Sequence, residues 1–205
     1  MLATYGDGMS MREAREVYFA VNGFGETGGY DDAWVDFKLG PIPMPFPNTR
    51  ARVEAVRYHD LHHLLTSYDT DIVGELEIAA WEIAAGCRSY GAAWVLNLAG
   101  TAAGMLRAPR RVFAAFVRGR GQRTAYGEDL DALLAMSVRE ARERFTRAAG
   151  TARRATLLDV LLFAATVAVG LVVALLLFAL VVPLVPFGLL AHAARRRRAR
   201  DGGAA

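Results

Sequence analysis

Residues 160–191 read VLLFAATVAVGLVVALLLFALVVPLVPFGLLA, a run with no charged side chain that consists mainly of Leu, Val, Ala and Phe. About 20 consecutive apolar residues are enough for a helix to cross the ~30 Å hydrocarbon layer of a bilayer. A chain of 205 residues forms too small a domain to bury such a helix on all sides. We therefore predict that residues 157–192 form an apolar membrane segment.

Arginines flank this segment on both sides. Arg153 and Arg154 precede it, and the stronger cluster Arg195–Arg198 follows it. Clustered arginine favours the cytoplasmic side of a membrane, so the tail after the segment is predicted to be cytoplasmic. Residues 1–7 have neither the basic nor the apolar region of a signal peptide, which predicts that the preceding domain is cytoplasmic as well.

The two placements agree if Pro183 and Pro186 break the run into a re-entrant segment. A single span from Leu161 to Val182 is simpler, and we prefer it slightly. Either way the chain divides into a helical metal-binding and lipid-binding domain (residues 1–150), the apolar membrane segment (157–192) and a basic tail (193–205). We expect the domain at the cytoplasmic face of a bacterial cell membrane, because Ala-rich composition with a single lysine, Lys38, is typical of GC-rich bacterial genomes.

Composition excludes some classes of protein. Lys and Arg total 24 against 21 Asp and Glu, a net charge of +3, which is too small for the whole chain to be a nucleic-acid binder. The one cysteine, Cys87, cannot form an internal disulfide and indicates a reducing compartment. A hydrophobic fraction of 54% excludes disorder for most of the chain.

Apolar spacing before residue 150 predicts an all-α domain. No stretch alternates well enough to predict a strand. The proline-rich residues 40–47 must be extended, and we expect them to form a strap over the domain surface, anchored by Ile42, Met44 and Phe46. The predicted helices are residues 9–21, 49–65, 71–85, 89–119 (long or broken) and 128–149.

Three of the four histidines lie within five residues, in Tyr58-His59-Asp60-Leu61-His62-His63. On a helix His59 and His63 share a face, and Asp60 flanks that face. Residues 67–71 are polar and turn-like, and Asp69, Thr70 or Asp71 can cap the next helix, which returns Glu75 towards the two histidines. We expect the small residue Gly74 to let the two helices approach closely.

Two imidazoles and two carboxylates form a nitrogen and oxygen donor set that suits Zn, Fe or Mn. We therefore predict that His59, Asp60, His63 and Glu75 bind a divalent metal, most favourably zinc. His62 points about 100° away from His63 on the helix, so we expect it to support the site from behind or to lie at the surface. The alternative is a set of solvated helix residues.

The same residues resemble the signature of the coenzyme Q biosynthesis protein four family, His-Asp-x-x-His followed by eleven residues and Glu. The motif is complete here as His59, Asp60, His63 and Glu75, and residues 69–76 resemble the family's continuation from loop to helix, as Trp81-Glu82 resembles the end of its second helix. The convincing likeness spans about residues 53–82, and a weaker one reaches about residue 145.

The resemblance implies an all-α protein on a membrane surface that binds zinc or a similar ion. It also implies a role in ubiquinone biosynthesis beside other enzymes of the pathway, in which the C1 carboxyl of a prenylated hydroxybenzoate is removed, with hydroxylation of that carbon in some members. Carried over to this chain, the ligands and catalytic residues are His59, Asp60, His63 and Glu75. The family's peripheral members lack an apolar tail such as residues 160–191.

A lipid substrate would need an apolar groove and a partner for its carboxylate. The small residues of the uncharged stretch 89–106 would leave such a groove if that helix is buried, while a second transmembrane helix is the alternative. Arginines follow this stretch directly. They could hold lipid headgroups, and one could clamp the carboxylate, with Arg107, Arg111 and Arg123 as candidates. Only two aromatic residues, Phe113 and Phe116, lie among these arginines, which disfavours nucleic acid as a partner.

Two other functions compete with a carboxy-lyase. A phosphohydrolase with a His-Asp dyad needs a further upstream histidine, and none precedes His59. A non-catalytic, membrane-anchored carrier of prenyl lipids, or a scaffold of a quinone-biosynthesis complex, would use the metal only to fix two helices together. Its partners would be a membrane lipid or prenylated quinone precursor, other enzymes of the pathway, and a further copy of the chain.

Overall fold

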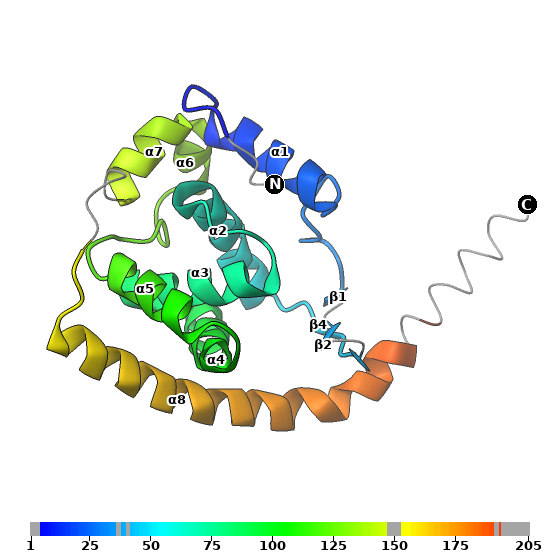
Figure 1. The fold of residues 1–205 in the computed structure, drawn as a ribbon. Helices are drawn as coiled ribbons and strands as arrows, with labels where there is room; N and C mark the ends of the chain where they lie inside the picture. The colour runs from blue at the N-terminus through cyan, green and yellow to red at the C-terminus, as the bar shows by residue number, and fades with distance from the viewer. Residues whose placement is uncertain (1–4, 36–37, 40–41, 147–152, 191–192, 194–205) are drawn as a thin grey trace, which may run out of the picture.

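The computed structural model describes residues 5–35, 38–39, 42–146, 153–190 and 193, and these residues are mainly helical (Figure 1), which confirms the predicted all-α class. The helices are α1 (Met11–Asn22), α2 (Arg50–Thr66), α3 (Ile72–Ala85), α4 (Gly91–Arg107), α5 (Pro109–Gly119), α6 (Leu130–Ala135), α7 (Val138–Phe145) and α8 (Leu157–Val181), followed by the 3-10 turn η1 (Val182–Leu184).

Helix α3 lies at the centre of the bundle, where it packs against both α4 and α5. Helix α2 lies on the other side of α3, and α1, α6 and α7 cover the outer side of α2 (Figure 1). Helix α8 passes below the bundle and packs against α4. The largest fully buried side chains of this core include Trp81, Tyr126, Phe145, Met11, Leu61 and Leu64.

Side-chain caps fix where the first helices begin. The hydroxyl of Ser10 accepts a hydrogen bond from the backbone N–H of Glu13, and the Glu13 carboxylate accepts one from the backbone of Ser10, which forms a capping box. Thr49 caps α2 and Asp71 caps α3 through their side-chain oxygens. These three starts agree with the predicted helices.

Two of the predicted helices are each divided in two. Residues 89–119 break at Pro109, which has no N–H for an unbroken helix and occupies the first turn of α5 instead. Residues 128–149 break before Val138, because Ser137 and Glu140 form a second capping box that starts α7. The last predicted residues of this segment, 147–149, lie outside the described residues.

The expectation of no strands is wrong for residues 34–47. Strands β1 (Trp34–Val35) and β4 (Phe46–Pro47) pair antiparallel, and so do β2 (Lys38–Leu39) and β3 (Ile42–Pro43). The extended strap therefore pairs with the segment before it. Met44 is buried and Phe46 half-buried, as expected of anchors, whereas the side chain of Ile42 lies outside the described part of the chain.

The apolar segment forms a helix from Leu157 to Leu190 that is long and apolar enough to cross a membrane, with a mean hydropathy of 3.0 in its most apolar window. Pro183 lies in η1, and the following residues are again helical. The prolines therefore do not reverse the chain within the described residues. Residues 194–205 of the predicted basic tail lie outside them.

Small residues of α4 allow close contact between helices. A Cβ at Gly104 would lie 2.7 Å from Cγ2 of Val112 on α5, and a Cβ at Gly100 would lie 3.0 Å from Cβ of Ala79 on α3. A Cβ at Gly170 of α8 would lie 3.1 Å from Cβ of Ala102. At these positions neighbouring helices fill the space in which we expected a lipid groove.

Candidate metal centre

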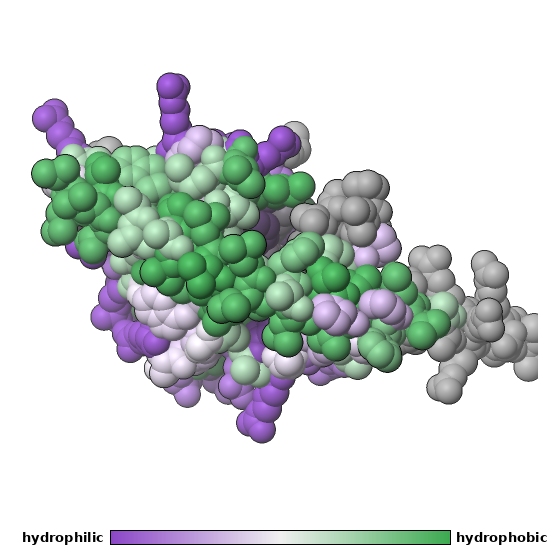
Figure 2. Space-filling model, turned by 90° about the horizontal axis from the view of Figure 1, so that it is seen from below, coloured by the Kyte–Doolittle hydropathy of each residue, from purple (hydrophilic) through white to green (hydrophobic). Residues whose placement is uncertain are grey.

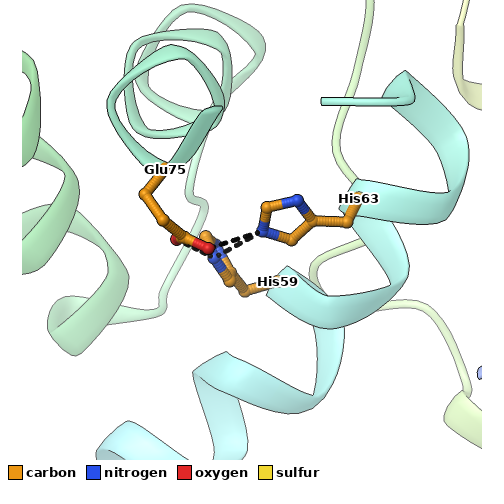
Figure 3. A group of neighbouring side chains, drawn as sticks. All are labelled: His59, His63 and Glu75. Carbon is orange, nitrogen blue, oxygen red and sulfur yellow. Dashed lines mark hydrogen bonds and ion pairs between the residues drawn. The ribbon is translucent and has the colours of Figure 1, made fainter. Parts of the chain in front are cut away.

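The two histidines of α2 and the glutamate of α3 meet at one point (Figure 3). Nε2 of His59 lies 3.2 Å from Nε2 of His63 and 3.2 Å from Oε2 of Glu75, and Nε2 of His63 lies 3.3 Å from Oε1 of Glu75. Ligands of a tetrahedral zinc ion, at about 2.1 Å from it, are about 3.4 Å apart. The three donor groups are thus already spaced as metal ligands.

The short connection between α2 and α3 brings Glu75 to the histidines. Ser67 ends α2 in the left-handed conformation at φ 60°, and the Asp71 carboxylate accepts a hydrogen bond of 2.7 Å from the N–H of Gly74. A Cβ at Gly74 would collide with the carbonyl group of Asp69. The absence of a side chain at Gly74 therefore makes room for the loop between α2 and α3. The sequence suggested instead that it lets helix α2 itself approach α3.

Hydrogen bonds on the far side of each ring orient the two imidazoles. Nδ1 of His63 lies 3.0 Å from the carbonyl oxygen of Tyr68, and Nδ1 of His59 lies 2.9 Å from Oε1 of Glu82. Because a carbonyl and a carboxylate only accept, both Nδ1 atoms donate. When both rings are neutral, each Nε2 atom therefore carries a lone pair and not a proton. The two Nε2 atoms and the Glu75 carboxylate are then three acceptors that face one another, and only a proton or a metal cation can satisfy them.

Glu82 is a buried carboxylate that the sequence prediction did not include in the site. Its side chain has no exposed surface, and it accepts hydrogen bonds from His59, from Nδ1 of His62 over 2.7 Å, from the Tyr126 hydroxyl over 2.6 Å and from Asn97. Burial raises the pKa of Glu82, but the charge of His59 and the hydrogen bonds from His59 and His62 outweigh burial and hold it well below 4.5. The carboxylate is therefore ionised.

His62 belongs to the support of the site and does not lie at the surface. Its Nε2 accepts a 2.9 Å hydrogen bond from the backbone N–H of Ala125, so its Nδ1 carries the proton donated to Glu82. Burial lowers the pKa of His62. A neutral His62 connects α2 to the loop after α5 and holds Glu82 in place behind His59.

The charges of the centre shift two pKa values in opposite directions. Burial raises the pKa of Glu75, but its hydrogen bonds with His59 and His63 outweigh burial and lower it to about 2. Burial lowers the pKa of His59, but Glu82 and Glu75 outweigh burial and raise it well above 6.5. Without a metal, a proton on His59 thus balances the carboxylates.

Asp60 does not belong to the group that the structure brings together. Its side chain is buried, and its Oδ2 accepts a 2.6 Å hydrogen bond from the hydroxyl of Tyr30. Burial raises the pKa of both Asp60 and Tyr30. The structure therefore places three of the four predicted ligands together and gives Asp60 a hydrogen-bonding partner of its own.

The centre is open on one side. The side chain of His63 is 1% exposed, that of His59 is 20% exposed and that of Glu75 is 44% exposed. The ring of Tyr18 on α1 stacks on that of His63 with 5.6 Å between ring centroids and covers His63. Structural zinc sites are closed by four protein ligands, whereas catalytic sites keep a position open.

Two of the three candidate arginines already pair with acids. Arg111 forms two hydrogen bonds with the carboxylate of Glu77, at 2.9 and 2.6 Å, and Arg123 binds Glu128 at 3.2 Å. Arg107 is exposed at the end of α4.

A different arginine lies near the tyrosine that binds Asp60. Nε of Arg15 on α1 is buried and has no hydrogen-bond partner among the described residues. Its guanidinium lies over the ring of Phe19, which contacts Tyr30 edge to face, and its charge acts on the Tyr30 hydroxyl. A sequence signal for Arg15 is absent, because the contact depends on how α1 packs.

A sequence signal for Glu82 does exist. It lies seven residues after Glu75, which places both carboxylates on the same face of α3. Two imidazoles and one carboxylate form the ligand set of catalytic zinc sites and also of non-haem iron sites, so the arrangement can hold a Lewis-acidic cation.

Comparison of the chain with protein-family models, with curated proteins and with solved structures gave no match.

Proposed function

We propose that the protein is a metal-dependent carboxy-lyase of quinone biosynthesis that removes the C1 carboxyl of a prenylated hydroxybenzoate at a membrane. The convergence of His59, His63 and Glu75 at spacings of 3.2 to 3.3 Å is the observation that carries this proposal. The resemblance of the His59 to Glu75 motif to the coenzyme Q biosynthesis protein four family supplies the substrate class and the reaction.

The divalent ion, zinc or alternatively iron or manganese, would act as a Lewis acid that stabilises negative charge on a phenolic or carboxylate oxygen. In the reaction the bond between C1 and the carboxyl carbon breaks, CO₂ leaves, and a proton takes its place on the ring. Oxidative members would instead need O₂ and a two-electron reductant, so that one oxygen atom becomes the hydroxyl group at C1 and the other leaves as water. Product analysis with and without O₂ separates the two.

The chain's own residues would position the donors and the substrate. Glu82 and the carbonyl of Tyr68 keep the Nε2 atoms of His59 and His63 turned to the open side. The buried, unpartnered Nε of Arg15 is the better candidate for the substrate's carboxylate, since Arg111 and Arg123 are already paired.

The apolar helix α8 supports the membrane part of the proposal, because a prenylated substrate resides in lipid. The competing function is a prenyl-lipid carrier or scaffold, in which the metal would only join α2 to α3. The exposed edge of Glu75 favours catalysis over that role, since a purely structural ion is normally enclosed by its ligands.

The test is decarboxylation by the purified full-length chain in detergent. We expect a prenylated hydroxybenzoate labelled at the carboxyl carbon to release labelled CO₂ after loading with Zn²⁺, Fe²⁺ or Mn²⁺. The His63→Ala variant should release none, and Glu54→Gln, an exposed glutamate of the same pair of helices, should behave as wild type. Stoichiometric metal in an inactive wild-type protein would contradict catalysis and support the carrier.

A further inference from the structure

The apolar helix from Leu157 to Leu190, which comprises α8 and its continuation through η1, has one face that is less exposed than the other. The less exposed positions between residues 159 and 188 recur every three or four residues, which is the period of one helix face. They are Asp159, Leu162, Phe163, Thr166, Val167, Gly170, Val173, Ala174, Leu177, Val181, Leu184, Val185 and Gly188.

Specific contacts hold the first half of this face. The buried carboxylate of Asp159 binds Arg153 at 2.9 Å and Arg120 at 3.4 Å. The ring of Phe163 lies 5.1 Å from that of Phe113 and 5.2 Å from that of Phe116 on α5. The beginning of α8 is therefore fixed to the domain by both charge and packing.

The middle and the far end are held as well. A Cβ at Gly170 would collide with the carbonyl oxygen of Leu98 on α4, so only glycine permits this approach of the two helices. A Cβ at Gly188 would lie 2.6 Å from Cγ of Pro45 and 3.0 Å from the Trp34 ring. Residues 163 to 188 span about 37 Å of helix, which exceeds the ~30 Å hydrocarbon layer.

The opposite face of α8 is apolar and exposed. Figure 2 shows hydrophobic side chains over much of this underside, with hydrophilic ones protruding mainly at its margins. Leu157, Leu161, Leu175, Leu176, Phe178, Leu180, Phe187 and Leu190 are each more than half exposed. An apolar surface of this length is not stable in water and needs a cover.

The charged residues around the apolar face indicate what covers it. Arginines adjoin both ends of the apolar face in the sequence: Arg154, which is exposed, precedes α8, and Arg195–Arg198, which lie outside the described residues, follow it. Arg107 at the end of α4 and Arg110 at the start of α5 are exposed as well. Arginines that border an apolar helix bind anionic headgroups while the helix enters the acyl chains. A second copy of the chain would bring these positive charges together.

We infer that α8 lies along the surface of a bilayer beneath the domain, with its outer face in one leaflet and both of its ends on the side of the domain. A crossing helix would have to release the domain or take charged groups such as the Arg111 and Glu77 pair into hydrocarbon. A helix lying in the leaflet keeps every contact described above and faces lipid only with its apolar side.

This arrangement brings the two topology signals of the sequence into agreement. The arginine cluster after α8 and the domain before it both remain in the cytoplasm, without a turn at Pro183 or Pro186. The metal centre is then held at a fixed height above the leaflet. The inference itself does not depend on the metal or on decarboxylation.

Sidedness of labelling tests it. Cys87 is buried, so single cysteines can be added to the natural chain and labelled with a membrane-impermeant maleimide. We would place one at the exposed Glu143 on α7 and one at Ala204, and label inside-out and right-side-out vesicles of bacterial inner membrane. Both sites should react at least about tenfold more in the same type of vesicle, and the wild-type chain should not react.

Depth gives an independent readout. Bimane attached at Leu161→Cys, Leu175→Cys or Leu190→Cys, all on the exposed face, should be quenched equally by lipids brominated at one shallow position. A crossing helix would place Leu175 about 15 Å deeper than the other two. The inference would be overturned if Glu143→Cys and Ala204→Cys were labelled from opposite sides of the membrane, or if the three bimanes lay at unequal depths. A lipid-free soluble dimer in which the three bimanes are not quenched would also overturn it.

Discussion

Glu82 and His59 share a hydrogen bond of 2.9 Å between Oε1 and Nδ1, and this contact joins the buried interior of the domain to the candidate metal centre. On one side of the contact, Glu82 is held by His62, Tyr126 and Asn97 in the core. On the other side, Nε2 of His59 faces His63 and Glu75. The position of a candidate metal ligand, His59, is thus decided by residues of the core that lie outside the candidate ligand group.

Replacing Glu82 should weaken metal binding without removing a ligand. Loss of a carboxylate that orients a ligating histidine typically reduces metal affinity by 10- to 100-fold. We expect Glu82→Gln to show a reduction of this order for Zn²⁺ in a chelator competition assay, and Tyr126→Phe, which removes one hydrogen bond to Glu82, to show a smaller one. Glu54→Gln on the exposed face of α2 is the control. Unchanged affinity in a folded Glu82→Gln protein would contradict this role.

Substitutions of Asp60 and of Glu75 should have different effects on the metal content of the protein. Because Asp60 lies outside the group and binds Tyr30, Asp60→Asn should keep about one metal ion per chain by elemental analysis. Glu75→Ala should lose the ion, since it removes one of three donors. If Asp60→Asn lost the metal while Tyr30→Phe kept it, Asp60 would be a ligand as the family motif implies.

The metal-free protein should lose stability as the pH rises above neutrality. His59 has a pKa raised well above 6.5 in the folded state, so its stabilising contribution is complete below about 6.5 and disappears as the pH rises through the raised value. The pKa of Glu75 is lowered to about 2, so its stabilising contribution changes only at acid pH. Glu75 therefore does not contribute to the loss of stability above neutrality. Melting temperatures measured from pH 6 to pH 10 should therefore fall.

The metal-loaded protein should not show that alkaline loss, because the ion replaces the proton of His59. Binding of Zn²⁺ at pH 7 should release a proton, which calorimetry in two buffers of different ionisation enthalpy measures. The variant His59→Gln provides the control, since its metal-free form should have a flatter pH profile. Parallel pH profiles for the metal-free and metal-loaded wild type would refute the assignment.

Gly74 should be needed for both stability and metal binding. A Cβ at this position meets backbone of the α2 to α3 loop, which cannot move aside as a flexible side chain can. We expect Gly74→Ala to lower the free energy of unfolding by roughly 1–3 kcal/mol and to reduce metal content by displacing Glu75. Gly91→Ala, where no atom lies within 4 Å of the added Cβ, should cause neither loss in the same denaturation and elemental assays.

The sequence determined the local features of this protein, because they depend on residues that are close together in the chain. The period of apolar residues predicted the helices, and the four-residue spacing of His59 and His63 with the cap at Asp71 predicted that Glu75 returns to them. The uncharged run after Asp159 predicted a helix suited to lipid. The Ser137 and Glu140 capping box that starts α7 is also a local feature of the sequence, and it divides the helix that was predicted for residues 128–149.

Tertiary packing alone decided which of these groups meet. Tyr30 reaches Asp60 from thirty residues away and Tyr126 reaches Glu82 from more than forty, so no spacing along one helix reveals either contact. The same holds for α8, whose small residue Gly170 fits against Leu98 only because the bundle presents α4 at that place. A buried carboxylate needs donors on every side, and an apolar helix needs a partner face, and both are supplied by segments distant in the chain.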